Sequence, residues 1–454
     1  MLEPKETFFV REKSFYKQWL SLMLFLALQN MIAYSVNMAD NVMLGSYSQS
    51  VLSGAAIVNQ LFFVVQIFAN ALGEGIVVLG SQYWGKKKLS PIRQCIGIGM
   101  KTGLFLSLCL VALCATQSGP LLGLFTADTQ ILVEAQKYLE IIQLTFPFFV
   151  VSTILYAGLR AVALVRIAFY TSIVSLGINV ICNYLLIYGN MGCPELGIQG
   201  AAIGTLIARI VELGMILLYV FRDRRLSLFS ENIFKRDPDL EKDYLRVDAP
   251  ILGAQLLWAL ATPIQTAILG HLSSDAIAAN SVSTTFYQYL KVIVQAMASA
   301  SAVMMGRAVG YGDWLRIREE GRTISGLSVA AGLILGGGLY LLRSPLLSLY
   351  ELNPTAMDLS NQFLLVMSVV MVGMSYQMCV SVGVIRGGGD TLFGFIMNMV
   401  STWLIVMPLS FLGAFVWQLP VVQVVILLQA DQVFKVIPVF FWYSNYRWVK
   451  KLAK

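Results

Sequence analysis

Ionisable side chains inside long apolar segments are the residues of this sequence that could do chemistry. Of the 454 residues, 57% are hydrophobic and only 13% are charged. An ionisable side chain at the centre of a bilayer costs about 2.5–3.5 kcal/mol on insertion scales, so each one needs a partner, a wet cavity or a function. The candidates are Asp40, Glu74, Lys101, Arg209, Glu212, Lys291, Asp431 and Lys435.

Two pairs among these residues have a spacing that allows mutual neutralisation. Arg209 and Glu212 are three residues apart, and Asp431 and Lys435 are four apart. These spacings place each pair on one face of a helix, so we expect two structural ion pairs, although Asp431 could instead face a cavity. Lys101 lies near the predicted inner end of its segment, and its long side chain can extend to the headgroups.

Two carboxylates have no such local partner. No basic residue lies within a helical turn of Asp40, which is either a hydrated group just beyond the end of its helix or a buried group that binds a cation. Glu74 lies between Gly73 and Gly75, and either a cavity role or an interhelical hydrogen bond fits it. Lys291 could be the partner of Glu74, or it could face the cavity and repel cationic cargo.

The segments that position these residues come in apolar blocks long enough to cross a membrane. A helix needs about 20 apolar residues for this, and lipid leaves backbone groups no other way to be satisfied. The sequence therefore predicts an all-α polytopic membrane protein. Its twelve predicted transmembrane helices are 17–44, 53–82, 94–117, 133–158, 167–189, 199–221, 247–269, 277–305, 322–342, 360–384, 392–415 and 419–443.

An internal repeat with an offset of about 225 residues divides these helices into two groups of six. Asp40–Gly45 aligns with Gln265–Gly270, and Gly80–Gly85 aligns with Met305–Gly310. A charged, polar stretch at 222–246 separates the copies and is interpreted as a cytoplasmic linker. We therefore expect two pseudo-symmetric six-helix lobes, an N-lobe at 1–221 and a C-lobe at 247–454, with the substrate path between them.

Lysine and arginine residues predict the orientation, because cytoplasmic loops carry them in excess. With the N-terminus inside, only Lys137 and Arg343 are clear exceptions, and both termini are expected in the cytoplasm. The formal charge of +7 is then a topology signal and not a nucleic-acid footprint. Outside the linker, the residues expected on the inner side are Lys5, Arg11, Lys13, Lys17, Lys86, Lys87, Lys88, Arg93, Arg160, Arg166, Arg307, Arg316, Arg318, Arg322, Arg386, Arg447, Lys450, Lys451 and Lys454.

Several function classes lack their signatures. There is no phosphate-binding loop motif, the single histidine is His271, and the six cysteines form no CxxC pair. The glycine run 336–338 lies inside a predicted span, where it favours close helix packing. We expect no enzyme activity, no cofactor and no nucleic-acid partner. The expected surroundings are a cell inner membrane, which the chain crosses as a monomer.

Several motifs resemble one transporter family. Asp40–Gly45, the SQYWGKKK block at 81–88, LRAVALVR at 159–166, IRGGGDT at 385–391 and the run from Asn179 to Thr205 are similar to multidrug and toxic compound extrusion (MATE) transporters. The resemblance covers essentially the whole chain. It implies an ion-coupled antiporter whose two lobes alternate between outward-open and inward-open states.

The resemblance also implies an ion-coupling site in the N-lobe at Asp40, Asn179, Asn183 and Thr205. Asn183 stands where DinF-like relatives carry a second carboxylate, so this site has one charge fewer. It could bind Na⁺ through oxygen ligands, or a proton if burial favours the neutral carboxyl. Interhelical hydrogen bonding is the alternative role of both asparagines. The acids that NorM-like relatives use in spans seven and ten are missing, so the chain is expected to be nearer the DinF-like type.

Cavity residues are harder to predict, because aromatic residues in such spans more often pack or face lipid. The residues that could contact a flat organic cargo are Glu74, Tyr34, Gln60, Tyr156, Lys291 and Tyr287. The expected function is export of organic, drug-like or cationic compounds by alternating access, coupled to H⁺ more than to Na⁺. The alternative is a flippase for lipid-linked saccharides, and a channel or receptor is less favoured.

The orientation can be tested with reporter fusions after residues 48, 128, 235 and 454. We expect external signals at 48 and 128 and cytoplasmic signals at 235 and 454, because basic residues surround the latter two positions. An alkaline phosphatase signal at 235 or 454 would contradict the twelve-helix topology.

Overall fold

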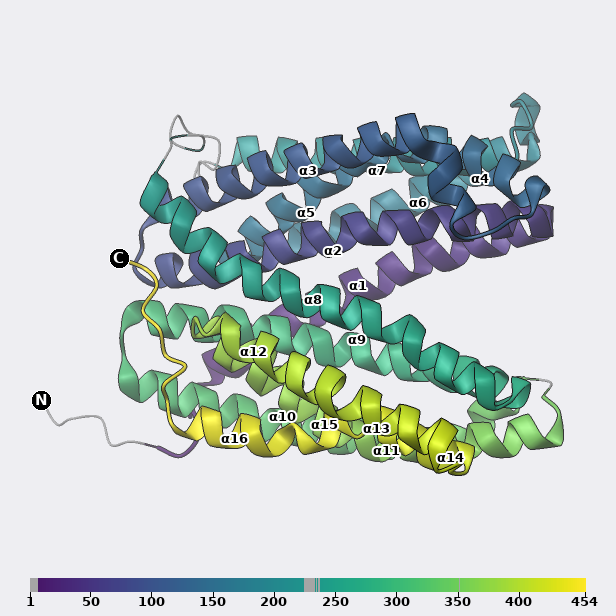
Figure 1. Ribbon diagram of the computed structural model, residues 1–454. Helices are drawn as coiled ribbons and strands as arrows, with labels where there is room; N and C mark the ends of the chain where they lie inside the picture. The colour runs from purple at the N-terminus through teal and green to yellow at the C-terminus, as the bar shows by residue number, and fades with distance from the viewer. Residues whose placement is uncertain (1–6, 224–232, 234, 236, 351) are drawn as a thin grey trace, which may run out of the picture. The chain divides into compact units, whose positions relative to one another are not determined.

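The computed structural model describes residues 7–223, 233, 235, 237–350 and 352–454. Every regular element in this described part is helical, which confirms the predicted fold class (Figure 1). Of the predicted linker, 222–246, residues 224–232, 234 and 236 lie outside the described residues. Its last part is helical, because Asp237 accepts a hydrogen bond from the Leu240 backbone nitrogen and Pro238 occupies the first helical position.

Residues 7–223 contain seven α-helices and one short 3₁₀ turn. They are α1 (Lys13–Tyr47), α2 (Gln49–Gly85), α3 (Leu89–Gly123), α4 (Thr129–Ile142), α5 (Thr145–Ala161), α6 (Arg166–Tyr188), η1 (Asn190–Gly192) and α7 (Ile198–Arg222).

The second half begins with long helices and continues with shorter segments. They are α8 (Pro238–Leu272), α9 (Ser274–Tyr311), α10 (Trp314–Leu347), α11 (Pro354–Gln377), η2 (Met378–Ile385), α12 (Thr391–Asn398), η3 (Met399–Val406), α13 (Met407–Phe411), η4 (Leu412–Val416), α14 (Val421–Gln429), α15 (Asp431–Phe434) and α16 (Val436–Ser444).

Within the described residues, eleven helices are long and apolar enough to cross a membrane, and a bent pair brings the number to twelve. That pair corrects one prediction, since span 133–158 is not a single helix. It divides into α4 and α5, which meet at 52°. Pro147 lies in the first turn of α5, where its missing N–H removes a bond that would join the two helices.

The helices form two compact units. The N-terminal unit contains 28–80 and 87–245, and the C-terminal unit contains 1–27, 81–86 and 246–454. The first turns of α1 and the last residues of α2 thus pack with the C-terminal unit, whereas the sequence pattern assigns all of 1–221 to one lobe. Trp19, for example, donates a hydrogen bond from Nε1 to Ser301 Oγ at 3.0 Å, and Gln82 Oε1 accepts from the Leu452 backbone nitrogen at 2.9 Å.

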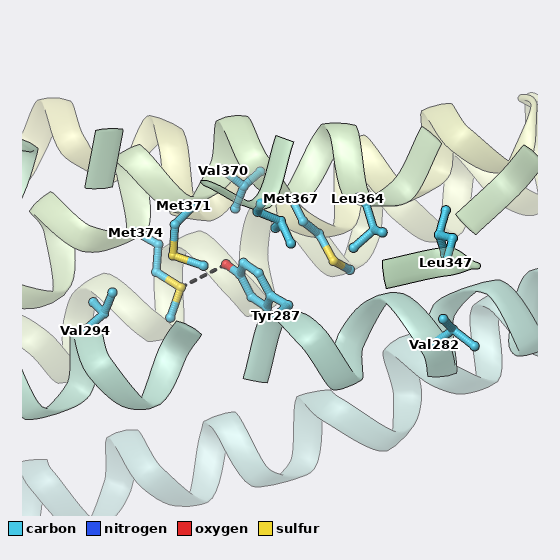
Figure 2. Packing of buried hydrophobic residues seen from close by; sticks show 10 residues of the cluster. Val282, Tyr287, Val294, Leu347, Leu364, Met367, Val370, Met371 and Met374 are labelled. Carbon is cyan, nitrogen blue, oxygen red and sulfur yellow. Dashed lines mark hydrogen bonds between the residues drawn. The ribbon is translucent and has the colours of Figure 1, made fainter. Parts of the chain in front are cut away.

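The interior of the C-terminal unit is apolar around α9, α10 and α11. Figure 2 shows Tyr287 of α9 against methionine side chains of α11, including Met367, Met371 and Met374. Lipid is as apolar as these side chains, so the cluster is stabilised mainly by close packing between the helices. Methionine adapts its shape to irregular gaps, so it suits packing between long helices that cross at an angle.

The glycine run 336–338 divides into one packed and two open positions. A β-carbon at Gly336 would clash with the Ser368 carbonyl oxygen of α11, whereas Gly337 and Gly338 face open space. Gly336 therefore lets α10 approach α11 closely, as the sequence predicts.

This difference gives a matched pair of variants. Gly336→Ala is expected to lower stability by about 1–3 kcal/mol through overpacking. Gly337→Ala is expected to be neutral or to stabilise by up to about 1 kcal/mol, because alanine favours helix more than glycine does. Thermal aggregation of the detergent-solubilised protein would measure both. Equal loss in the two variants would contradict the packing role of Gly336.

Candidate functional site

The four residues of the predicted ion-coupling site come together in the N-terminal unit. Asp40 lies on α1, Asn179 and Asn183 lie on α6, and Thr205 lies on α7. Asn183 Nδ2 donates to Asp40 Oδ1 at 2.5 Å and to Asn179 Oδ1 at 3.4 Å. Asn179 Nδ2 in turn donates to Thr205 Oγ1 at 3.2 Å. A continuous hydrogen-bonded chain therefore joins three helices, and Asp40 forms its end.

Helical spacing explains why these groups meet. Thr171, Ser175, Asn179 and Asn183 follow one another at intervals of four, and all four are buried on one face of α6. This face packs against α7, where a β-carbon at Gly204 would collide with Asn183 Oδ1. The missing side chain thus lets the two helices approach closely around the amide. A polar stripe in a membrane helix is tolerated where it lies inside the protein and forms hydrogen bonds.

The site retains unused acceptor capacity. Asn183 is completely buried, and its Oδ1 atom accepts no hydrogen bond from the described residues. Asp40 is partly buried, and its hydrogen-bond donor is an amide rather than a cationic group. Carboxylate, amide and hydroxyl oxygens are hard ligands, which suit a proton or an alkali cation better than a soft metal. The arrangement can hold one small cation beside one negative charge.

A second polar network lies one turn further along α7. Arg209 Nη1 binds Glu212 Oε2 at 2.7 Å, so the pair predicted from its spacing is confirmed. Tyr156 Oη donates to Glu212 Oε1 at 2.9 Å and lies 2.6 Å from Thr171 Oγ1. Tyr156 thus takes part in a hydrogen-bond network while it remains partly exposed, and its contact with a cargo stays a prediction. The guanidinium of Arg209 also lies 5.0 Å from the centre of the Phe149 ring.

Glu74 has a cationic partner that the sequence does not indicate. Its Oε1 atom lies 2.8 Å from Arg160 Nη2 of α5, and both side chains are largely buried. The sequence pattern places Arg160 in a loop of the inner side, but it lies in the last turn of α5. Glu74 is therefore neutralised inside its own unit, and pairing with Lys291 is not needed to explain it.

The remaining predicted cavity residues have different surroundings. Tyr34 is 45% exposed and Gln60 is exposed, so both are accessible. Tyr287 is 8% exposed, and its Oη donates to Met374 Sδ at 2.8 Å within the apolar cluster, as Figure 2 shows. Tyr287 thus packs inside the apolar cluster, and its contact with a cargo stays a prediction. Lys291 is half-buried, and its Nζ lies 4.8 Å from the centre of the Trp258 ring.

In the C-terminal unit, Asp431 and Lys435 form the other predicted ion pair, at 2.8 Å. Sequence reasoning misses the amides around it, which are Gln377, Asn398 and Gln432. Gln432 Nε2 donates to Asp431 Oδ2 at 2.9 Å, and Lys435 Nζ donates to Asn398 Oδ1 at 3.0 Å. Polar amides within apolar spans are the signal that could have identified them.

Comparisons with known proteins give one consistent result. The family model MatE matches residues 26–185 and 250–412. A protein of Thermotoga maritima named "Probable multidrug resistance protein NorM" is 24% identical over 93% of this chain and 91% of its own length. A protein of the same name from Halalkalibacterium halodurans is 26% identical over 91% of this chain and 90% of its own length.

Solved structures agree in fold. The Vibrio cholerae MATE transporter VcmN in its bent form has a TM-score of 0.85 at 20% identity and covers 95% of this chain and 97% of its own. A Pyrococcus furiosus transporter of the MOP superfamily, whose structure is described as having a reversed polarity of the binding pocket, has a TM-score of 0.83 at 17% identity, covering 96% and 97%. At these identities the likeness establishes the two-lobe helical fold.

The Glu74–Arg160 contact can be tested by a double-mutant cycle. Arg160→Met should destabilise the protein by roughly 1–3 kcal/mol, because it leaves a largely buried carboxylate without its cation. Adding Glu74→Gln should recover part of this loss. Thermal unfolding in detergent of the two single variants and the double variant measures the coupling. Strict additivity would show that the two side chains do not interact.

Proposed function

This chain belongs to the MatE family of membrane transporters, and from this premise we propose that it exports organic compounds in exchange for a cation. The names of its relatives support drug-like compounds as cargo. The observation that carries the proposal is the Asp40 cluster, where an intramembrane carboxylate contacts amides instead of a fixed cation. Such a carboxylate can be neutralised reversibly by an ion from either side.

The composition of the cluster favours H⁺ over Na⁺. A dehydrated Na⁺ needs several oxygen ligands and is held better by two carboxylates than by one. The buried amide of Asn183 stands 2.5 Å from Asp40 Oδ1 and supplies a donor where a second acid would supply charge. A single carboxylate is sufficient to carry one proton.

A cycle follows from the hydrogen bonds of Asp40. When Asp40 is ionised, it accepts a hydrogen bond from Asn183. Asn183 also donates to Asn179, which in turn donates to Thr205 of α7. Protonation weakens the attraction of Asp40 for that donor, so α1 gains freedom to shift relative to α6. The ion can move the equilibrium between outward-open and inward-open states only through such a difference in contacts.

The same cluster is the basis for placing the protein nearer the DinF-like type, with coupling in the N-lobe. Many relatives carry the NorM name, so this subtype assignment rests on the residues around Asp40 and on the acids missing from predicted spans seven and ten. We further propose that the chain acts as a monomer in the cell inner membrane, with both termini in the cytoplasm.

Replacing Asp40 tests the coupling role. Asp40→Asn is expected to lower energised dye efflux at least tenfold while membrane insertion stays within about twofold of wild type, because an amide keeps the size but cannot take up a proton. Efflux of fluorescent dyes, one cationic and one anionic, from a pump-deficient bacterium is the readout. Asp358→Asn is the matched control, since Asp358 is exposed and accepts a hydrogen bond from Gln362 of its own helix. Efflux at the wild-type rate in the Asp40 variant would move coupling elsewhere.

The identity of the ion is tested in everted vesicles. We expect efflux activity with a pH gradient and no sodium, and little activity with a sodium gradient at fixed pH. Asn183→Asp should add sodium-dependent activity, because it places a second carboxylate beside Asp40. Sodium-driven transport by the unmodified protein without any response to the pH gradient would refute proton coupling.

A further inference from the structure

A group of polar side chains lies within the apolar helices of the C-terminal unit, and we call it the C-lobe polar cluster. Lys435 Nζ contacts both Asp431 Oδ2 and Asn398 Oδ1, at 2.8 and 3.0 Å. Gln432 Nε2 donates to Asp431 Oδ2 at 2.9 Å, and Gln377 Nε2 donates to Gln432 Oε1 at 2.9 Å. Lys291 joins this group through Trp258, because its ammonium lies over the Trp258 ring and Trp403 of η3 donates to the carbonyl oxygen of Leu257, next to Trp258. The cluster comprises Lys291, Gln377, Asn398, Asp431, Gln432 and Lys435.

Three helices lose regular α geometry at this cluster. The π-helix η2 begins directly after Gln377, and the π-helix η3 begins directly after Asn398. Around α15, the Ala430 and Val433 backbone nitrogens bond to carbonyls three residues earlier instead of four. π segments and tightened turns inside long helices frequently mark functional sites, because they redirect side chains and leave backbone groups able to bind. Irregular backbone at membrane depth is tolerated where it is covered by protein or lines a cavity.

The charges of the cluster do not balance. Asp431 has an ion pair with Lys435 at 2.8 Å, and both side chains are buried. Lys291 adds a second cation near the middle of α9, and no carboxylate of the described residues lies within ion-pair distance of it. Its close contact is the indole face of Trp258, at 4.8 Å. An aromatic face attracts an ammonium but does not neutralise it. With Lys291 protonated, the cluster therefore has one positive charge in excess.

The surroundings of Lys291 suit a flat ligand. Trp258 is 48% exposed although it contacts the ammonium, so part of its ring remains accessible. Trp403 of η3 donates from Nε1 to the carbonyl oxygen of Leu257, the neighbour of Trp258, at 3.2 Å. This bond ties η3 to the helix turn that carries Trp258. A ring that stacks near Trp258 would place an attached acid group close to the ammonium.

From this geometry we propose that the C-lobe polar cluster binds the acid group of an aromatic monoanion, a carboxylate or sulfonate, with Lys291 as its charge partner and Trp258 beside its ring. The inference deepens the proposed function and rests on it, since it names the class of cargo. One excess positive charge matches one negative charge. A lipid-linked diphosphate carries more charge and needs more fixed cations than the cluster offers.

Binding of two dyes that share a fluorophore and carry opposite charges tests the proposal. The probes are dansylglycine, which carries a carboxylate, and the same dansyl fluorophore with a trimethylammonium group. Fluorescence anisotropy with the full chain in nanodiscs should show at least tenfold tighter binding of dansylglycine. Lys291→Met and Lys291→Gln should each weaken dansylglycine at least tenfold and leave the ammonium dye unchanged or bound more tightly. Lys291→Arg should stay within about threefold of wild type.

Lys101→Met is the matched control, because Lys101 is an exposed lysine of α3 in the other unit, and it should change neither affinity. The proposal would be overturned if the wild-type protein bound the two dyes with equal affinity, or if both neutral Lys291 variants bound dansylglycine as the wild type does. The comparison of the two dyes in the wild type remains valid even if a variant fails to fold. In a competition experiment, farnesyl diphosphate could displace dansylglycine. If it bound more tightly than dansylglycine, the result would overturn the proposal in favour of a lipid diphosphate.

The two proposals can fail separately. Selective binding of dansylglycine without any transport would support the anion site and refute the exporter. Export of ethidium by the wild-type chain without selectivity for dansylglycine would refute the anion site alone.

Discussion

The neutralisation of charge without water is the constraint on which the arrangement of polar groups depends. Lipid offers an ionised side chain neither hydrogen bonds nor counterions, so each charge within the apolar helices has to find a partner in the protein. Arg209 with Glu212, Arg160 with Glu74, and Lys435 with Asp431 all meet this requirement at 2.7 to 2.8 Å. Asp40 and Lys291 meet it only in part, through an amide and an aromatic ring. Among the eight groups named here, Asp40 and Lys291 are therefore the ones for which an ion or a ligand has a physical reason to bind.

The same constraint explains the packing of the helices that carry these groups. Buried amides and hydroxyls on α6 need partners within hydrogen-bonding distance, and the small residues of α7 allow that distance. At Gly204 even a methyl group would displace the amide of Asn183. Hydrogen bonding of the buried amides therefore requires close packing of α6 against α7, because a wider gap between the helices would leave the amides unpaired. The contrast with Gly337, which faces open space, shows that only some glycines of the spans have this role.

What the sequence can predict depends on whether partners lie on one helix. Arg209 and Glu212 share a helix, and the fixed rise of the helix makes their contact readable from spacing. Arg160 and Glu74 lie on different helices, so their contact depends on packing that a single sequence does not contain. The twelve apolar blocks are long enough to identify, but the bend between α4 and α5 depends on the local effect of Pro147. The π segments η2 and η3, which begin directly after Gln377 and Asn398, have no comparable sequence signal.

The charged clusters inside the two units have opposite net signs, and this difference bears on how an exchanger can work. In the N-terminal unit, the carboxylates of Asp40, Glu74 and Glu212 stand against the guanidinium groups of Arg160 and Arg209, which leaves one negative charge in excess. The C-lobe polar cluster holds Lys291 and Lys435 against Asp431, an excess of one positive charge. A cation bound beside Asp40 would neutralise the excess negative charge of the N-terminal unit, and an anion bound at the C-lobe polar cluster would neutralise its excess positive charge. Each would reduce the free-energy cost of a buried charge. Inward movement of a cation and outward movement of an anion also transfer charge in the same electrical direction. A membrane potential that is negative inside would then drive both halves of the exchange, so the opposite polarities add their driving forces.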